Sequence, residues 1–394
     1  MNTNYYTYKQ SDYTLRDIKV SFYTKPGLPD WENVSASIRL LAEHIQVKHQ
    51  GRLLLFGCEK GITATLLARM FNPYEIWATD DNYIAIQTCR ATLQLNGITN
   101  FTVFGPELDL PENSFDCAVI DLPKGRSNAR RWLSAAQHAI KPGGQCYLAG
   151  ANNLGIQSII RDGEALFGNL ALLGYKKGNR IVRLEKLAFP PASPKWIDDP
   201  GIAPGTWIKF TASINNQVYT LSSLPGVFSH DHLDEGSRLL IEHFPDMQNQ
   251  KVLDLGCGCG IIGLIAARQG AEHVDLVDVN LSAIASARKN VNEYHISRAR
   301  VFPGDLFDWV KDEKYTLIVS NPPFHTGRAV DTLAAETFIK QTPGQLIVDG
   351  CLLIVANKFI RYDRLMKQSF GRVDIIAETS KYHLIRATTP SISP

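Results

Sequence analysis

The chain repeats itself, and this duplication limits its possible folds more than any other feature. Four blocks of similar sequence recur about 200 residues apart, and their order is the same in both halves. Chance similarity would not keep four blocks in order, so we expect two copies of one domain. The paired blocks are 51–70 with 250–269, 75–98 with 273–296, 114–126 with 314–328, and 141–153 with 348–358.

Each half alternates short apolar runs with stretches of helical periodicity. LLLF and CAVID are such runs in the first half, KVLDL and TLIVSN are such runs in the second, and SAIASARKNVNEYH has apolar residues at helical spacing. Nearly continuous apolar strands that alternate with helices are typical of a mostly parallel sheet covered on both faces. We therefore predict an α/β protein with two tandem Rossmann-like domains, each a doubly wound, mostly parallel sheet.

A segment rich in Pro and Gly, AFPPASPKWIDDPGIAPG, separates the two halves. Such a composition indicates irregular chain. The run TWIKFTASINNQVYTLSS, which follows it, predicts a small β-extension that opens the second half. We predict a first domain over 1–190, a linker over 191–205 and a second domain over 206–394.

Composition excludes several classes of protein. The 394 residues are 44% hydrophobic and 20% charged, as in ordinary globular domains. The N-terminal sequence lacks the apolar region of a signal peptide, and no run of about 18 apolar residues could span a membrane. The seven cysteines form no CxxC pair, so we expect reduced thiols, a cytoplasmic location and no metal site. The net charge of +2 does not by itself indicate a nucleic-acid partner.

A glycine-rich turn in the second half is a candidate ligand site. VLDLGCGCG runs from a predicted strand into a helix, with Asp254 near the strand end and Gly256, Gly258 and Gly260 in the turn. Glycines let the backbone approach a ligand closely, and Asp278 ends the next strand, where an acidic residue suits a ribose. The GxGxG spacing differs from the GxGxxG of dinucleotide sites, which is the competing interpretation, and a purely structural turn is the other.

The sequence Asn321-Pro322-Pro323-Phe324 ends a later strand of the same half. The carboxyl ends of parallel strands share one edge, so this motif and the glycine turn should face one pocket. The Asn321 side-chain oxygen and the Pro322 carbonyl are acceptors that can hold a planar amine, while Phe324 can stack on a flat base. We therefore assign catalytic roles to Asn321, Pro322 and Phe324. The alternative is a Pro-rich turn with Phe324 in the core.

Together these motifs resemble the class I S-adenosylmethionine-dependent methyltransferases that act on amines. The resemblance implies that S-adenosylmethionine is the cofactor, with its methionine part near Asp254–Gly258 and its ribose at Asp278. It also implies that the adenine lies near Asp305, a position that could equally be a helix N-cap.

A narrower resemblance is to the bacterial ribosomal RNA guanine-N2 methyltransferases, which are tandem duplications of this fold. It implies that Phe228 and Asp231 line the cofactor pocket. The segments that carry it are 224–240, 252–260, 320–327, 354–366 and 382–390.

This resemblance implies methylation of a guanine N2 amine in ribosomal RNA, with the small subunit favoured over the large one. The partner would be ribosomal RNA or a ribosomal subunit, and the tandem copies make a monomer plausible. Two alternatives remain open: methylation of a protein glutamine amide, and a non-catalytic RNA-binding or ribosome-assembly factor with a vestigial pocket.

The first copy departs from the second at the motifs themselves. Glu59 and Lys60 stand where the second copy has Gly258 and Cys259, and DLPK replaces NPPF. We predict that the first copy does not catalyse, although Asp80 survives opposite Asp278.

The first copy also carries basic residues that predict a role in RNA binding or structural support. Ordinary solvated surface is the alternative interpretation. The candidate phosphate-binding residues are Lys124, Arg126, Arg130, Arg131, Lys176 and Lys177.

Overall fold

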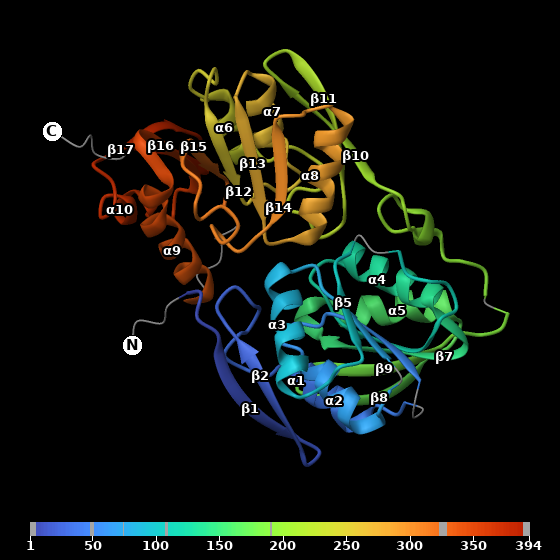
Figure 1. Cartoon of the computed structure of the whole chain (residues 1–394). Helices are drawn as coiled ribbons and strands as arrows, with labels where there is room; N and C mark the ends of the chain where they lie inside the picture. Colours follow the sequence, from blue (N-terminus) through green and yellow to red (C-terminus); the bar gives the residue numbers. More distant parts are fainter. Residues whose placement is uncertain are drawn as a thin grey trace. The chain divides into compact units, whose positions relative to one another are not determined.

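The chain divides into two units, which are described separately because their relative placement is not determined (Figure 1). They comprise Met1–Trp207 and Ile208–Pro394. Within the predicted linker 191–205, Trp196 and Ile202 are buried in the core of the first unit. The computed structural model describes residues 5–47, 51–73, 75–106, 109–189, 191–322 and 329–388, with only the backbone described for 329–332.

The C-terminal unit is built on a seven-stranded sheet in the order β14-β13-β12-β15-β16-β18-β17. All neighbours pair in parallel except β18, which is antiparallel to both β16 and β17. The strands are β12 (Lys251–Leu255), β13 (His273–Asp278), β14 (Ala299–Pro303), β15 (Tyr315–Ser320), β16 (Leu346–Asn357), β17 (Arg372–Glu378) and β18 (Tyr382–Thr388). The helices are α6 (Glu235–Glu242), α7 (Ile261–Arg268), α8 (Leu281–Glu293), α9 (Ala329–Gln345) and α10 (Tyr362–Met366).

The N-terminal unit has the same strand arrangement, in the order β5-β4-β3-β6-β7-β9-β8, with β9 antiparallel to its neighbours. The predicted fold class, two doubly wound and mostly parallel sheets, is confirmed. The strands are β3 (Arg52–Phe56), β4 (Glu75–Thr79), β5 (Phe101–Phe104), β6 (Phe115–Asp121), β7 (Ile140–Ala151), β8 (Ala171–Lys176) and β9 (Asn179–Glu185). The helices are α1 (Ala36–His44), α2 (Ile62–Phe71), α3 (Tyr83–Leu95), α4 (Arg126–Ala139) and α5 (Ile156–Phe167).

An antiparallel hairpin opens each unit. The predicted β-extension is confirmed as β10 (Ile208–Ile214) paired with β11 (Gln217–Ser223), and β11 packs on α8. Its counterpart in the first unit is β1 (Lys9–Leu15) paired with β2 (Ile18–Thr24), which the sequence analysis did not predict. Each hairpin leads into the loop that enters the next helix, so it places that loop beside the sheet.

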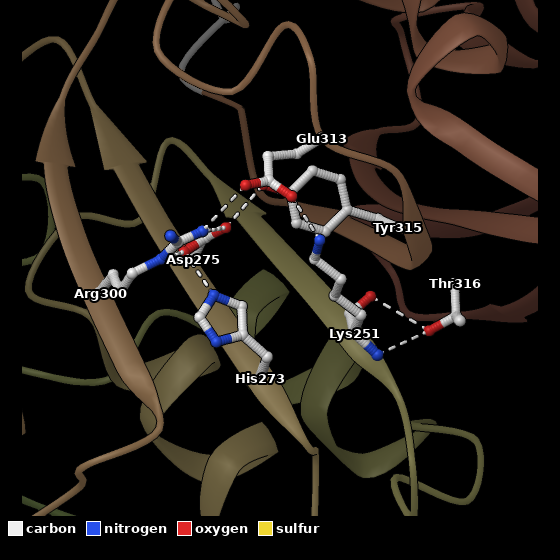
Figure 2. Close-up of polar contacts among 7 residues, drawn as sticks. All are labelled: Lys251, His273, Asp275, Arg300, Glu313, Tyr315 and Thr316. Atoms are coloured by element: carbon white, nitrogen blue, oxygen red, sulfur yellow. Dashed lines mark hydrogen bonds and ion pairs between the residues drawn. The ribbon is translucent and has the colours of Figure 1, made fainter.

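A charged network ties together the amino ends of the central strands in the C-terminal unit (Figure 2). The Asp275 carboxylate is fully buried and accepts two hydrogen bonds from Arg300, one from the Tyr315 hydroxyl and one from His273. Glu313 contacts Arg300 at 3.5 Å and also pairs with Lys251. This network links β12, β13, β14 and β15 at the edge opposite the glycine turn, so it holds the strands whose other ends form the site.

Candidate active site

Three predicted site residues lie at one edge of the C-terminal sheet. Asp254 is in β12, Asp278 ends β13 and Asn321 follows β15, and β12 lies between the other two strands. The chain leaves β12 toward β13 on one side and returns to β15 on the other. Such a switch point is where open α/β sheets bind ligands, beyond the carboxyl ends of their strands.

The glycines of the turn after β12 have two different functions in the structure. Gly260 has φ +84°, and a Cβ there would lie 2.9 Å from the Ala287 side chain, so this glycine lets α7 pack closely on α8. Gly256 and Gly258 also have positive φ, at +75° and +55°, but a Cβ on either would meet no described atom within 4 Å. The backbone of the turn is therefore open at Gly256 and Gly258.

Asp254 carries a buried oxygen that needs a donor. Its Oδ2 accepts a hydrogen bond of 2.9 Å from the Gly263 backbone N–H, while its Oδ1 has no partner among the described residues. Burial raises the pKa of Asp254 to about 7, and the nearby Asp278 contributes to this shift. An unpaired buried acceptor costs about 1–3 kcal/mol, so the position favours a ligand that brings a donor or a positive charge.

Asp278 organises the loops around this edge. Its two oxygens accept from the backbone N–H groups of Gly258 and Asn280, each at 2.8 Å, and burial raises its pKa. Asn280 caps α8 through its side-chain oxygen and donates from Nδ2 to the Gly226 carbonyl at 2.9 Å. The β13 end thus holds both the glycine turn and the loop that precedes α6.

The Asn321 amide is held in one orientation. Its Nδ2 donates to Asp234 Oδ2 at 2.8 Å and to Ser237 Oγ at 2.9 Å, and the side chain is buried. Because both N–H groups are used, the Asn321 side-chain oxygen is the part of the amide that can accept a hydrogen bond from a ligand. Pro322 follows as a buried residue, while Phe324 lies outside the described residues.

Asp234 and Ser237 contact Asn321 and are absent from the predicted set of site residues. Asp234 also caps α6 by accepting from the Ser237 N–H at 3.1 Å. The same carboxylate also accepts from Asn321, so the cap and the amide clamp form one unit. The sequence indicates the cap, because Asp is a preferred N-cap residue, but it does not indicate the contact with Asn321.

The remaining predicted residues lie around this edge with less distinctive geometry. Asp231 is exposed and contacts His232 Nδ1 at 2.6 Å, and this hydrogen bond lowers its pKa. Phe228, on the same loop, is 47% exposed. Asp305 is buried after β14 and begins a series of turns, so it does not cap a helix. No group of three or more metal-ligating side chains was found in the described part of the chain.

Comparisons with known proteins define the family. A model of the methyltransferase small domain matches residues 19–183 and, a second time, residues 218–386. The chain belongs to this family. Ribosomal RNA small subunit methyltransferase C of Psychromonas ingrahamii is 35% identical over 282 residues, which cover 71% of this chain and 77% of that protein. Its namesake from Pseudomonas entomophila is 34% identical over 280 residues, covering 71% and 81%.

A solved structure has the same two-unit fold. It is the T. thermophilus 16S rRNA N2 G1207 methyltransferase (RsmC) in complex with AdoMet and guanosine, with a TM-score of 0.79 and 24% sequence identity. The match covers 97% of this chain and 98% of that one. The resemblance drawn from the sequence motifs is therefore confirmed at the level of family and fold.

The corresponding edge of the N-terminal unit carries different side chains with different contacts. Lys60 is buried, and its ammonium donates to the backbone carbonyls of Asp30 and Asn33 at 2.8 and 2.7 Å. Leu55 occupies the strand position of Asp254 and supplies no acceptor. Asp121 takes the place of Asn321 and accepts from the Ser37 hydroxyl at 3.0 Å. These contacts support the prediction that this copy lacks methyl transfer.

Glu59 makes the N-terminal turn sensitive to pH. Burial raises its pKa to about 7, with a further contribution from Asp121, although Lys60 opposes the shift. The folded pKa lies above the unfolded value of about 4.5, so the ionisation of Glu59 lowers the free energy of unfolding as pH rises above that value. The loss reaches its full size above about pH 7. Glu59→Gln is expected to stabilise the N-terminal unit at pH 8 by about 1 kcal/mol, with no gain at pH 4. Calorimetry at pH 4 and pH 8 measures the change in stability, and Glu164→Gln, at an exposed residue, serves as the control. An equal gain for Glu59→Gln at the two pH values would contradict the prediction.

The predicted RNA-binding residues differ in their availability. Arg126 and Arg130 both make bidentate contacts with Asp162, and Arg130 also lies over the Trp196 ring. Arg131 is largely buried and lies 3.9 Å from Asp81. These three guanidinium groups thus take part in contacts within the unit. The other three candidates, Lys124, Lys176 and Lys177, are exposed, and Lys176 lies 3.7 Å from the Glu43 carboxylate.

Proposed function

We propose that this protein transfers a methyl group from S-adenosylmethionine to the exocyclic N2 amine of a guanine in small-subunit ribosomal RNA. The observation that carries the proposal is the orientation of Asn321, whose amide nitrogen is fully engaged and whose oxygen is left as an acceptor. A planar amine needs such an acceptor to fix its N–H groups. The relatives named above act, by their names, on small-subunit ribosomal RNA.

The residues at the sheet edge fit the cofactor. The unpaired Asp254 oxygen suits a ligand ammonium group, and the open backbone at Gly256 and Gly258 leaves room for a chain beside it. Asp278 would face the ribose hydroxyls, and Asp305 would lie toward the adenine. When bound, this cofactor supplies an activated methyl group.

The residues of the protein then contribute by orienting the guanine amine toward the methyl group. The Asn321 oxygen and the Pro322 carbonyl would each accept one N–H of the guanine amine, which aims the nitrogen lone pair. Asp234 and Ser237 hold the amide in the required orientation. Methylation makes the amine nitrogen acidic, so water can take up the proton and no dedicated base is needed.

The N-terminal unit would bind RNA or support the catalytic unit. Exposed Lys124, Lys176 and Lys177 are the candidates for phosphate contacts, which would make binding depend on salt concentration. We infer a monomer that acts on a ribosomal subunit or its RNA in the cytoplasm. Within the described residues, no helix is both long and apolar enough to cross a bilayer.

The test is methylation with radiolabelled cofactor, using 30S subunits, 16S ribosomal RNA and a glutamine-containing release factor as separate substrates. We expect label in N2-methylguanine from one of the RNA substrates. Label in protein glutamine would favour the alternative amide substrate. Binding of the cofactor without transfer to any of these substrates would contradict the proposal.

Cofactor affinity should depend on the protonation state of Asp254. With a pKa of about 7, this carboxyl is mostly ionised at pH 8 and mostly neutral at pH 6. A ligand ammonium favours the ionised form, so the Kd for S-adenosylmethionine should rise about tenfold between pH 8 and pH 6. Titration calorimetry measures the change. Asp254→Asn should bind S-adenosylmethionine weakly, and its Kd should depend less on pH. If the pH dependence of the Kd were the same in this variant as in the wild type, a group other than Asp254 would be the one that titrates.

A further inference from the structure

A tight turn presents an aromatic side chain at the catalytic edge of the C-terminal sheet. Strands β15 and β16 are parallel neighbours, with Ser320 opposite Ile354, so the turn after β16 lies at the same edge as Asn321. The Asn357 carbonyl accepts from the Ile360 N–H at 2.8 Å, and the Asn357 side-chain oxygen accepts from the Phe359 N–H at 3.3 Å. These bonds fix the backbone on both sides of Phe359.

The Phe359 side chain is 86% exposed, although its neighbours anchor the turn from below. Ile360 packs on the core of the unit, and Tyr362 is buried in it. A large aromatic ring exposed on an ordered turn gains nothing for the fold, since the burial of a Phe side chain is worth about 1.5–3 kcal/mol. The position therefore needs an explanation other than stability.

Cationic residues lie close to Phe359 in the sequence of this turn. Lys358 pairs with Glu378 at 3.2 Å, Arg361 pairs with Asp363 at 3.1 Å, and the Lys358 N–H donates to the Lys381 carbonyl. Surface ion pairs of this kind contribute about 0–1 kcal/mol each, so an incoming phosphate can replace the carboxylates at little cost. An aromatic face flanked by exchangeable cations fits a single-stranded nucleic acid, whose bases stack and whose phosphates are anionic.

The first unit provides an internal comparison. Its β6–β7 pair has Ile120 opposite Leu148, so the position that corresponds to Phe359 is Asn153, which is exposed and polar. The copy that lacks the Asn321 clamp thus also lacks the aromatic ring at this turn. The ring accompanies the clamp and is not required by the fold.

We propose that Phe359 stacks on a nucleobase next to the target guanine and so positions the RNA strand over the clamp. This role rests on the proposed function and deepens it, because base stacking beside the target would make RNA a better substrate than a free nucleoside. Lys358 and Arg361 would contact the phosphates on either side of the stacked base. Phe359 is a substrate-positioning residue with no part in the transfer itself.

Steady-state kinetics test this role. Phe359→Ala should raise the KM for ribosomal RNA by about 5–150-fold, the range expected for the loss of one base stack of about 1–3 kcal/mol. Cofactor Kd and activity on free guanosine should stay unchanged, and Phe359→Trp should restore the KM. Phe189→Ala is the matched control, because Phe189 is 92% exposed in the other unit. An unchanged KM in Phe359→Ala, or an equal rise in Phe189→Ala, would overturn the proposal.

A binding measurement separates this proposal from the proposed function. The probe is a single-stranded oligouridylate with one central guanosine and 2-aminopurine on its 5′ or 3′ side, whose fluorescence falls on stacking. We expect quenching at one side with the wild-type protein and Phe359→Trp, and its loss in Phe359→Ala. Quenching that persists in Phe359→Ala contradicts the stacking role even if methylation is normal. Absence of methyl transfer with Phe359-dependent quenching would instead contradict the proposed function alone.

Discussion

Asn321→Ala is expected to lower kcat for methyl transfer by about 10²–10³-fold while the Kd for S-adenosylmethionine changes less than about threefold. The loss of one preorganised hydrogen-bonding group in an active site typically has an effect of this size. Cofactor binding should survive, because Asp254, Asp278 and the glycine turn do not use the Asn321 side chain for any hydrogen bond that the structure describes. Single-turnover methylation and calorimetry measure the two quantities separately.

Two further variants separate the acceptor role from simple packing. Ser237→Ala removes one of the two hydrogen bonds that orient the Asn321 amide, so we expect a smaller loss, about 5–10-fold in kcat. Asn321→Asp reproduces the residue of the first copy and sets a carboxylate against Asp234, so it should be as inactive as Asn321→Ala. Full activity in Asn321→Asp would contradict the amide clamp, because two carboxylates at hydrogen-bond distance repel each other or share a proton.

The sequence predicted the repeated core of the fold well, and physical reasons explain why. Apolar runs such as LLLF and TLIVSN are buried on both faces of a parallel sheet, so their pattern is strong and appears twice. The glycine turn was also predictable, but for a different reason. Gly260 is required by the close packing of α7 on α8, so a glycine stands at this position. The duplication also allowed the two copies to be compared position by position. Glu59 and Lys60 were thereby recognised as differing from the residues of the glycine turn in the second copy.

The parts that were not predicted depend on contacts between distant residues or on weak patterns. The pairing of Asn321 with Asp234 joins positions 87 residues apart, and no local pattern indicates it. Strand β1 is polar and mostly exposed, so its strand signal is weak, whereas β2 alternates apolar residues, two of which, Val20 and Phe22, are buried, and this signal was overlooked. The segment around Trp196 was taken as a linker because of its Pro and Gly content, and that composition does not indicate that Trp196 and Ile202 lie in the core of the first unit.

Asp275 is the position where a single change should most affect stability. Asp275→Ala leaves the buried Tyr315 hydroxyl without its acceptor and removes the two hydrogen bonds that Arg300 makes to the carboxylate (Figure 2). The Tyr315 side chain is fully buried, so the loss of its acceptor costs about 1–3 kcal/mol, whereas the Arg300 side chain is 46% exposed and remains solvated. For a domain of this size, that corresponds to a fall of about 2–12 °C in the unfolding temperature of the C-terminal unit, measurable by calorimetry.

The pH dependence and a control on the same network make this prediction specific. Burial alone would raise the pKa of Asp275, but hydrogen bonds from Arg300, Tyr315 and His273 lower it. Its contribution to stability is therefore present above the unfolded pKa of about 4 and is lost as pH falls through the folded value, so the gap between variant and wild type should narrow only in acid. Glu313→Gln, on a 38% exposed carboxylate that contacts the same Arg300, should cost less than about 1 kcal/mol. Equal losses of stability in Asp275→Ala and Glu313→Gln would mean that the network acts as screened surface charge. The sheet edge that bears Asp254, Asp278 and Asn321 would then be held by apolar packing alone.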